Sequence, residues 1–216
     1  QTLILSDVIG NRLDMIASGP TVPDPTTFQD ALAIIRKYQL MKTIPESILA
    51  ILENGAKGKN PETFKHGDLP AGRVHNHLVG TIEKAVHAAK RMAENLGYTS
   101  RIVTTTLTGK TDEVAEYVDR VTQTALAQSE PTCLLFGGET TVEVTGEGLG
   151  GRNQDLTLRM VPRLAINPGV LFLSLATDGE DGPTDAAGAA VDAHVFADGN
   201  RILQTSYGTY LQTFDS

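Results

Sequence analysis

The sequence predicts an α/β fold with a mostly parallel, layered sheet and flanking helices, because β-rich and helical patterns alternate along its second half. Three stretches rich in apolar or β-branched residues, 101–107, 133–136 and 170–176, are expected to be strands. Apolar residues at helical spacing predict helices over 111–128 and 153–164. The strand–helix–strand order then indicates a right-handed crossover between parallel strands.

The N-terminal part predicts a partial second α/β domain. Residues 3–5 are expected to form a short buried strand, and Thr27 is placed to cap a helix over 28–41. A second helix is expected over 45–54, with Gly55 just past its end.

A stretch rich in glycine, proline and charge, 55–72, has no apolar period and predicts a linker. The domain boundary is therefore placed there, with residues 1–70 in the first domain and residues 71–216 in the second. A regular helical period then predicts one long helix over 76–96.

Composition narrows the classes of protein to consider. The 216 residues carry a net charge of −8, which disfavours general binding to nucleic acid or to an anionic membrane. The single cysteine, Cys133, rules out an intrachain disulfide and fits a reducing, cytoplasmic compartment. No apolar run approaches the ~18 residues that span a bilayer. The first residues lack a basic segment and a Met, and are expected to be a strand within a longer protein.

A glycine-rich stretch over 137–155 is the first candidate site. Its Gly-Gly pair after an apolar run predicts a turn, and Arg152 and Asn153 are expected to open the helix that follows. Glycines allow close backbone approach, a helix N-terminus offers N–H donors, and arginine binds phosphate or carboxylate as a planar fork. The pattern fits an anion site, and it equally fits a glycine-rich hairpin before an ordinary capped helix.

A second candidate lies in the acidic stretch 177–185, directly after the strand expected at 170–176. Asp178 could accept a proton from a substrate hydroxyl or help to hold a metal, and the same residues also fit a pair of Asp-Gly turns. If the three strands are parallel, their carboxyl ends share one edge, where α/β sheets bind ligands.

Other motifs are incomplete. The run Thr108-Gly109-Lys110-Thr111 lacks the upstream glycine of a Walker A loop, so Thr111 is interpreted as a helix cap. No Gly-x-Ser-x-Gly elbow is present, which removes the support for a serine hydrolase.

Three long motifs, in order along the chain, resemble the glycerate kinases of the MOFRL type. They are Gly-Gly-Glu-Thr-Thr at 137–141, Gly-Gly-Arg-Asn-Gln-Asp at 150–155, and Thr-Asp-Gly-Glu-Asp-Gly-Pro-Thr-Asp-Ala-Ala-Gly at 177–188. The runs Ser-Asp-Val-Ile-Gly at 6–10 and Ile-Ala-Ser-Gly-Pro-Thr at 16–21 resemble the end of that family's N-terminal domain.

The resemblance implies ATP-dependent phosphorylation of D-glycerate, mostly at the 2-hydroxyl, with Mg²⁺, in a cleft between two α/β domains. It implies that this chain is an incomplete piece, inactive alone, because the family's catalytic lysine lies in a segment absent here. By the match, Arg152 and Asp178 are the catalytic residues. The expected substrate- or ATP-binding residues are Asp7, Ser18, Gly19, Gly137, Gly138, Glu139, Gly150, Gly151 and Asn153.

The chain departs from the family pattern in three places. Asn11-Arg12 stand where an acid is usual, His75-Asn76-His77 replace a small residue followed by Asn, and Asp155 replaces the commoner Glu. Two alternatives remain open: a hydroxypyruvate reductase, although no dinucleotide fingerprint is present, and a non-catalytic anion- or nucleotide-binding module.

Overall fold

The computed structural model describes residues 1–68, 72–128, 130–194, 200–214 and 216. The chain divides into two units, Gln1–Thr81 and Ile82–Ser216, which are described separately below. The predicted domain boundary between residues 70 and 71 lies outside the described residues and stays a prediction.

The first unit contains a parallel pair of strands, β1 (Thr2–Ser6) and β2 (Asn76–Thr81). The strand predicted at 3–5 is confirmed, but it is not buried, because Leu3 and Leu5 are 72% and 79% exposed. The helix predicted from residue 76 is wrong over its first six residues. Hydrogen bonding to β1 draws this segment into a strand, and Gly80 admits the side chain of Leu5, which an added Cβ would overlap. The helical period therefore begins only after β2.

Two helices complete the first unit, together with the short 3₁₀ turns Ile16–Ser18 and Leu40–Lys42. Helix α1 (Phe28–Lys37) begins with a capping box between Thr27 and Asp30, as the sequence predicts, but it ends earlier than residue 41. Gln39 adopts a left-handed conformation (φ 57°), which a continuing helix excludes.

Helix α2 (Glu46–Ala56) contains Gly55, which the sequence placed beyond the helix end. Gly55 is buried, and an added Cβ would overlap the ring of Phe28. The glycine is needed there because α1 and α2 pack closely, rather than because the helix terminates.

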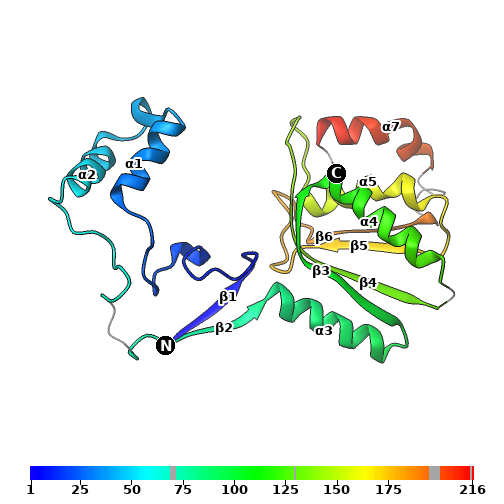
Figure 1. Ribbon diagram of the computed structural model, residues 1–216. Coiled ribbons are helices and arrows are strands. Elements are labelled where there is room, and N and C mark those ends of the chain that lie inside the picture. Colours follow the sequence, from blue (N-terminus) through cyan, green and yellow to red (C-terminus); the bar gives the residue numbers. More distant parts are fainter. Residues whose placement is uncertain (69–71, 129, 195–199, 215) are drawn as a thin grey trace. The chain divides into compact units, whose positions relative to one another are not determined.

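The second unit is built on a longer parallel pair, β3 (Thr99–Lys110) and β4 (Thr132–Thr141). Helix α3 (Ile82–Asn95) packs on this pair, and α4 (Thr111–Leu126) connects its two strands (Figure 1). Both strands extend beyond the predicted 101–107 and 133–136, so the α/β class with parallel strands and flanking helices is confirmed.

The remaining strands form an antiparallel pair, β5 (Leu171–Leu175) and β6 (Gly188–Asp192). Helix α5 (Arg152–Leu164) packs on both strands, and α7 spans Asn200–Thr213. The segment predicted at 170–176 is a strand, but within the described residues it hydrogen-bonds to β6 rather than joining β3 and β4 in one parallel sheet.

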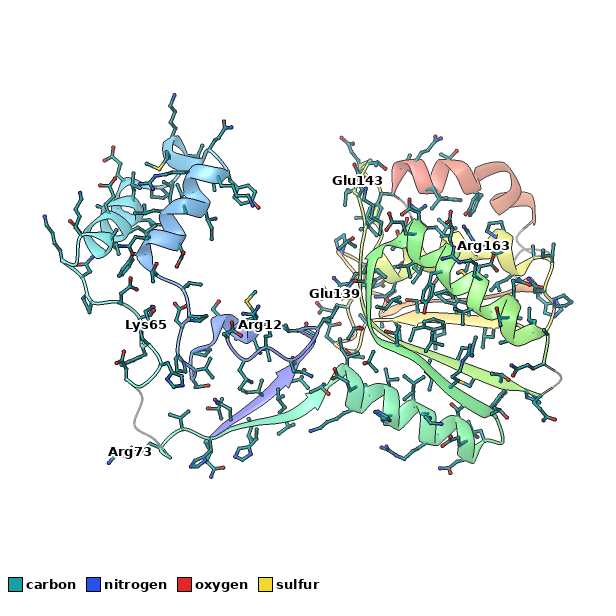
Figure 2. The ribbon with its side chains drawn as sticks, in the orientation of Figure 1. Arg12, Lys65, Arg73, Glu139, Glu143 and Arg163 are labelled. Atoms are coloured by element: carbon teal, nitrogen blue, oxygen red, sulfur yellow. The ribbon has the colours of Figure 1, made fainter. Side chains whose placement is uncertain are left out.

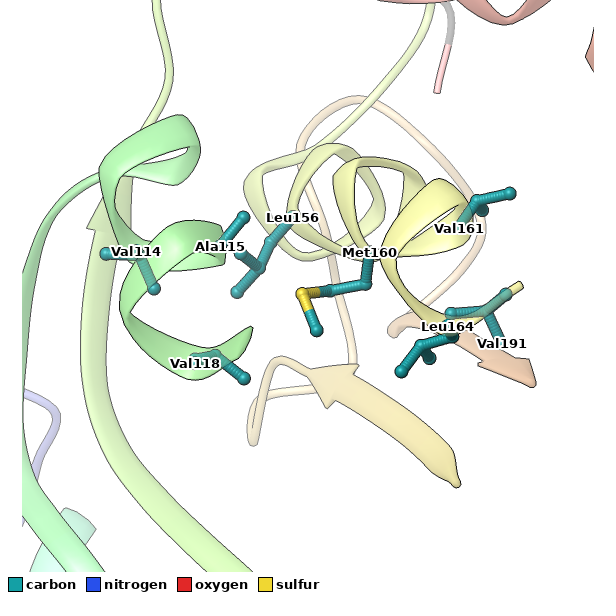
Figure 3. Packing of buried hydrophobic residues seen from close by; sticks show 8 residues of the cluster. All are labelled: Val114, Ala115, Val118, Leu156, Met160, Val161, Leu164 and Val191. Atoms are coloured by element: carbon teal, nitrogen blue, oxygen red, sulfur yellow. The ribbon is translucent and has the colours of Figure 1, made fainter. Parts of the chain in front are cut away.

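The core of the second unit lies between α4, α5 and β6 (Figure 3). The side chains of Met160 and Leu164 are fully buried, and Met160 lies between the two helices and the strand. The helical spacing in the sequence correctly placed α5 and this face. The core is formed by Val114, Ala115, Val118, Leu156, Met160, Val161, Leu164 and Val191.

Candidate functional site

The first turn of α5 is the centre of the candidate site. Gly151 is its N-cap, with an extended backbone (φ −131°, ψ 167°) and no capping side chain of its own. Arg152 is the first helical residue, as the sequence predicts. The missing cap is supplied from elsewhere in the chain, by Asp181.

The carboxylate of Asp181 is almost completely buried and accepts four hydrogen bonds from this turn. One oxygen accepts from the backbone N–H and the side-chain amide of Asn153, both at 3.0 Å. The other accepts from the backbone N–H of Gln154 at 2.8 Å and from its side-chain amide at 3.1 Å. The sequence pattern fitted an anion site at this helix N-terminus. In the structure the Asp181 carboxylate is itself an anion that binds two of the N–H groups there.

The side chain of Asn153 forms hydrogen bonds inside the unit at both its amide nitrogen and its amide oxygen. Besides its bond to Asp181, its amide oxygen accepts a hydrogen bond from the Ser174 hydroxyl at 2.7 Å, which ties α5 to β5. A direct contact of Asn153 with substrate stays a prediction, and the structure shows a bracing role.

Arg152 and Glu139 are two predicted site residues that the structure brings together. A guanidinium nitrogen of Arg152 lies 2.7 Å from a carboxylate oxygen of Glu139, and both side chains are 43% exposed. Glu139, labelled in Figure 2, belongs to β4 and pairs with Thr108 of β3. The arginine is therefore held near the carboxyl end of the parallel strand pair.

The Gly-Gly pair at 137–138 continues β4, so the predicted turn is wrong. Gly138 pairs with Leu107 of β3 at a positive φ of 153°, and an added Cβ would overlap the Leu107 carbonyl. An added Cβ on Gly137 would lie 2.6 Å from side-chain atoms of Ile82 and Val86. These glycines make room for the protein's own atoms, and ligand binding by them stays a prediction.

Gly150 and Gly151 likewise face other parts of the chain. An added Cβ on Gly150 would overlap the hydroxyl of Ser216, and one on Gly151 would overlap the carboxyl group of Asp181. The loop before them is tied to α7 through the Thr145 hydroxyl, which donates to the Gln212 carbonyl at 3.0 Å. The end of the glycine-rich loop is thus packed against Asp181 and the C-terminal residues of the chain.

Asp178 is exposed and follows β5 in a turn. One of its carboxylate oxygens accepts the Glu180 backbone N–H at 3.2 Å, and Gly179 has a φ of 92°. The local structure is thus the Asp-Gly turn that the sequence also allowed. The carboxylate of Asp178 is exposed and accessible to a substrate, and its catalytic role stays a prediction.

The sequence missed two buried acidic residues around α5. Asp181 lies in the acidic motif, but nothing in the residue pattern distinguished it from its acidic neighbours. Asp155, also buried, pairs with Arg159 at 2.7 Å and accepts a hydrogen bond from the hydroxyl of Thr111. Thr111 is therefore not the cap of α4, whose N-cap is Lys110; it fastens the start of α4 to α5.

The predicted residues of the first unit lie in the loop after β1. Asp7 is exposed, and Ala17, Ser18 and Gly19 follow one another in left-handed conformations (φ 48°, 61° and 64°). Such values are strained for the two residues that have a Cβ, and strain of this kind concentrates at functional sites. Ligand binding by Asp7, Ser18 and Gly19 stays a prediction.

The two departures from the family pattern in this unit make internal contacts. Arg12 pairs with Asp14, and this hydrogen-bonded charge lowers the pKa of the Asp14 carboxyl. Asn76 of β2 accepts a hydrogen bond from the Thr21 hydroxyl at 2.7 Å and donates to its carbonyl at 3.3 Å. Asn76 thereby anchors the loop that carries Ser18 and Gly19.

One cavity in the described part of the chain lies away from the predicted site residues. A cavity of about 390 Å³ is lined by Arg101, Ile102, Val103, Val121 and Thr124, and it includes no predicted site residue. Among the described residues, no group of three or more His, Cys, Asp or Glu side chains is placed to hold a metal ion. No described helix combines the length and apolar character needed to cross a bilayer.

The second unit is an α/β unit in which a half-exposed arginine begins a helix beside the end of a parallel strand pair. Residues 132–216 match the MOFRL family, and residues 1–53 match a domain of unknown function named DUF4147. By this match the segment 132–216 belongs to the MOFRL family, which confirms the family resemblance seen in the motifs.

Several proteins that are similar to this chain are named glycerate kinases. Glycerate 2-kinase of Pyrococcus horikoshii is 41% identical over 199 residues, which cover 90% of this chain and 44% of the relative. Glycerate kinase of Rattus norvegicus is 34% identical over 259 residues, which cover 100% of this chain and 48% of the relative. The crystal structure of glycerate kinase from Thermotoga maritima matches with a TM-score of 0.77 and 35% identity, over 99% of this chain and 49% of that chain. The chain thus spans about half the length of the curated relatives it matches.

Proposed function

We propose that this chain acts as part of a glycerate kinase. The enzyme would transfer the terminal phosphoryl group of ATP to the 2-hydroxyl of D-glycerate and yield 2-phosphoglycerate and ADP. The relatives named glycerate kinase support the reaction. The observation that carries the proposal is Arg152, half-exposed at the first position of α5 and 2.7 Å from Glu139.

Arg152 is the group best suited to bind transferring phosphate. Phosphoryl transfer is catalysed mainly by positioning and by stabilising charge on the phosphate oxygens. The guanidinium fork matches two phosphate or carboxylate oxygens. Its ion pair with Glu139 is half-exposed, and such pairs contribute only ~0–1 kcal/mol. A phosphate can therefore displace Glu139 from the guanidinium, or share the guanidinium with it, at little cost in free energy.

Asp178 is proposed to orient the acceptor hydroxyl or to take its proton. Its exposed carboxylate follows β5 directly, in a turn that leaves the side chain accessible. A general base must come within hydrogen-bond reach of the proton it removes, and an accessible carboxylate on a turn meets the first requirement for that.

ATP is the proposed phosphate donor and Mg²⁺ the proposed metal. In kinases Mg²⁺ is commonly held by one or two carboxylates and by substrate phosphates. The exposed carboxylate of Asp178 fits that donor set, whereas a metal cage made by protein alone does not fit the described residues. When bound, Mg²⁺ would neutralise charge on the phosphate oxygens.

The test is a phosphoryl-transfer assay on the full-length protein, with the product position read by NMR. We expect 2-phosphoglycerate from ATP and D-glycerate, and no turnover by the 216-residue chain alone. Robust activity of that chain would refute the incomplete-piece interpretation. Oxidation of NADH with hydroxypyruvate, without phosphate transfer, would favour a reductase instead.

Replacing Arg152 tests the site. We expect Arg152→Ala to lower kcat/KM on the order of 10²–10³-fold, the loss typical of removing one charge-stabilising donor. Arg120→Ala, which removes an exposed arginine from α4, is the matched control and should leave turnover near that of the wild type. Near-normal turnover of Arg152→Ala would exclude the proposed role.

A further inference from the structure

Asp181 is a buried acid that the proposed chemistry does not use. Only 1% of its surface is exposed, and both carboxylate oxygens accept hydrogen bonds from the two residues that follow Arg152. We propose that Asp181 is a positioning residue: it fixes the first turn of α5, so that the Arg152 guanidinium is held beside Glu139 at the end of β4. The inference deepens the proposed function and rests on it.

Each oxygen of Asp181 binds one residue twice. One oxygen holds the backbone N–H and the side-chain amide of Asn153, and the other does the same for Gln154. Paired bonds of this kind fix both the backbone and the side chain of each residue. The Arg152 backbone immediately before them is therefore restrained as well.

The chain around this carboxylate leaves no room for displacement. An added Cβ on Gly151 would overlap the Asp181 carboxyl group, and one on Gly182 would lie 2.5 Å from the Gly150 carbonyl oxygen. Gly182 also has a positive φ of 64°, which glycine adopts without strain. The Gly-Gly and Asp-Gly pairs of the two motifs therefore pack directly against each other.

Two further hydrogen bonds anchor the same turn. The Ser174 hydroxyl of β5 donates to Asn153 at 2.7 Å, and the Gln154 side-chain amide donates to the Thr184 hydroxyl at 2.8 Å. A shift of the turn would break these contacts together. Arg152 is thus carried by a braced element rather than by a flexible loop.

The same contacts decide which group meets an incoming phosphate. The carboxylate already accepts the backbone N–H groups of Asn153 and Gln154 and opposes the positive end of the helix dipole. Those two donors are no longer available for a ligand. An anion at this end of α5 therefore meets the Arg152 side chain rather than the N–H groups of Asn153 and Gln154.

The experiment compares Asp181→Asn with Asp185→Asn, an exposed acid in the same loop. The asparagine keeps the shape but turns an NH₂ group toward N–H donors, which loosens the turn. We expect Asp181→Asn to lower kcat on the order of 10²-fold with a smaller change in KM, as misplacement of a catalytic group does. Asp185→Asn should match the wild type.

A double-mutant cycle separates positioning from general destabilisation. If Asp181 acts through Arg152, Asp181→Asn lowers kcat/KM no further once Arg152→Ala is present. Two losses that multiply would overturn the inference while leaving the kinase proposal intact. Absence of phosphoryl transfer by the wild type would instead defeat the proposed function.

An NMR measurement decides the inference without activity. The side-chain Nε–H signal of Arg152, assigned by its absence in Arg152→Lys, should be resolved in the wild type and in Asp185→Asn. In Asp181→Asn it should move to the position of a solvent-exposed arginine, and an unchanged signal would overturn the inference.

A milder variant covers the case in which Asp181→Asn does not fold. Gln154→Met removes the side-chain donor to Asp181 and keeps the backbone N–H. We expect a several-fold loss of kcat and the same direction of movement of the Arg152 signal. No change in either quantity would count against the proposal.

Discussion

The two units of the chain are stabilised in different ways. The first, Gln1–Thr81, buries few large side chains, with Leu32 and Ile35 the buried apolar residues of α1. Its supports include the Thr27–Asp30 capping box, the exposed ion pair of Arg12 with Asp14, and the hydrogen bonds by which Asn76 holds Thr21.

The second unit, Ile82–Ser216, has a shared core and two buried acids with their own partners. Asp155 and Asp181 are both satisfied by hydrogen bonds from distant residues. The difference teaches that the candidate arginine sits on the unit with a shared apolar core and buried acids, whereas the strained Ser18 loop sits on the unit that buries few large side chains.

The largest effect is expected from a cavity in the second unit. Met160→Ala removes a fully buried side chain and should cost ~2–5 kcal/mol in unfolding free energy. Urea unfolding monitored by circular dichroism measures the loss. Hydrogen exchange should rise in α4, α5 and β6 and stay unchanged in α1 and α2, because the units have separate cores.

Met92→Ala is the matched control. Met92 lies on α3 in the same unit and is 59% exposed, so the change should stay within ~0.5 kcal/mol. A loss in the control equal to that of Met160→Ala, or faster exchange in α1, would break the comparison between the units.

An intermediate effect is expected at the link between α4 and α5. Thr111→Val removes the hydroxyl that donates to buried Asp155 and should cost ~1–3 kcal/mol, because a buried carboxylate loses a donor. Thr124→Val in the same helix removes an exposed hydroxyl that bonds only its own helix backbone, at Arg120. If both variants lose equal stability, the buried network contributes little to the second unit.

A smaller effect is expected in the first unit. Thr27→Ala removes the N-cap of α1 and should cost ~0.5–2 kcal/mol, with faster exchange confined to α1 and its neighbours. Ser47→Ala, an exposed position in the first turn of α2, should be nearly neutral. Faster exchange spreading into α5 after Thr27→Ala would contradict the comparison between the two units.

The smallest effect is a pH dependence of the same helix. The Thr27 hydroxyl and then its backbone N–H lower the pKa of Asp30. Its contribution to stability is present above the unfolded-state pKa, about 3.9, and is lost as the pH falls through the lower folded value. The protection factors of the α1 amides, which correct for the pH dependence of intrinsic exchange, should therefore fall below about pH 4 in the wild type. In Asp30→Asn this fall should disappear, and its persistence would assign it to another acid.

The fold of the second unit was largely predictable, because apolar spacing alone located α4 and α5. Leu156, Met160 and Leu164 recur on one helical face, and the structure buries all three. The strand β2 was not predictable in the same way. Its six residues run directly into α3, and only pairing with β1, more than 70 residues earlier in the chain, makes them a strand.

The site was predictable in its cation but not in its supports. Arg152 follows a glycine pair at a helix start, which is a local pattern. The choice between Asp178 and Asp181 depends on the turn at Gly182 and on partners 27 and 28 residues upstream. The pairing of Glu139 with Arg152 depends on β4 continuing through Gly137 and Gly138, where the sequence pattern predicted a turn.

The interlocking of Gly151 with Asp181 also bears on how the two motifs can be exchanged among relatives. Each segment supplies one half of the hydrogen bonds. Residues 150–155 provide the N–H donors, and the segment 178–185 provides the carboxylate that accepts them. They therefore behave as one transplantable module, although 22 residues with two secondary-structure elements separate residues 150–155 from 178–185. A chimaera that exchanges the glycine loop between distant homologues must carry the acidic loop with it.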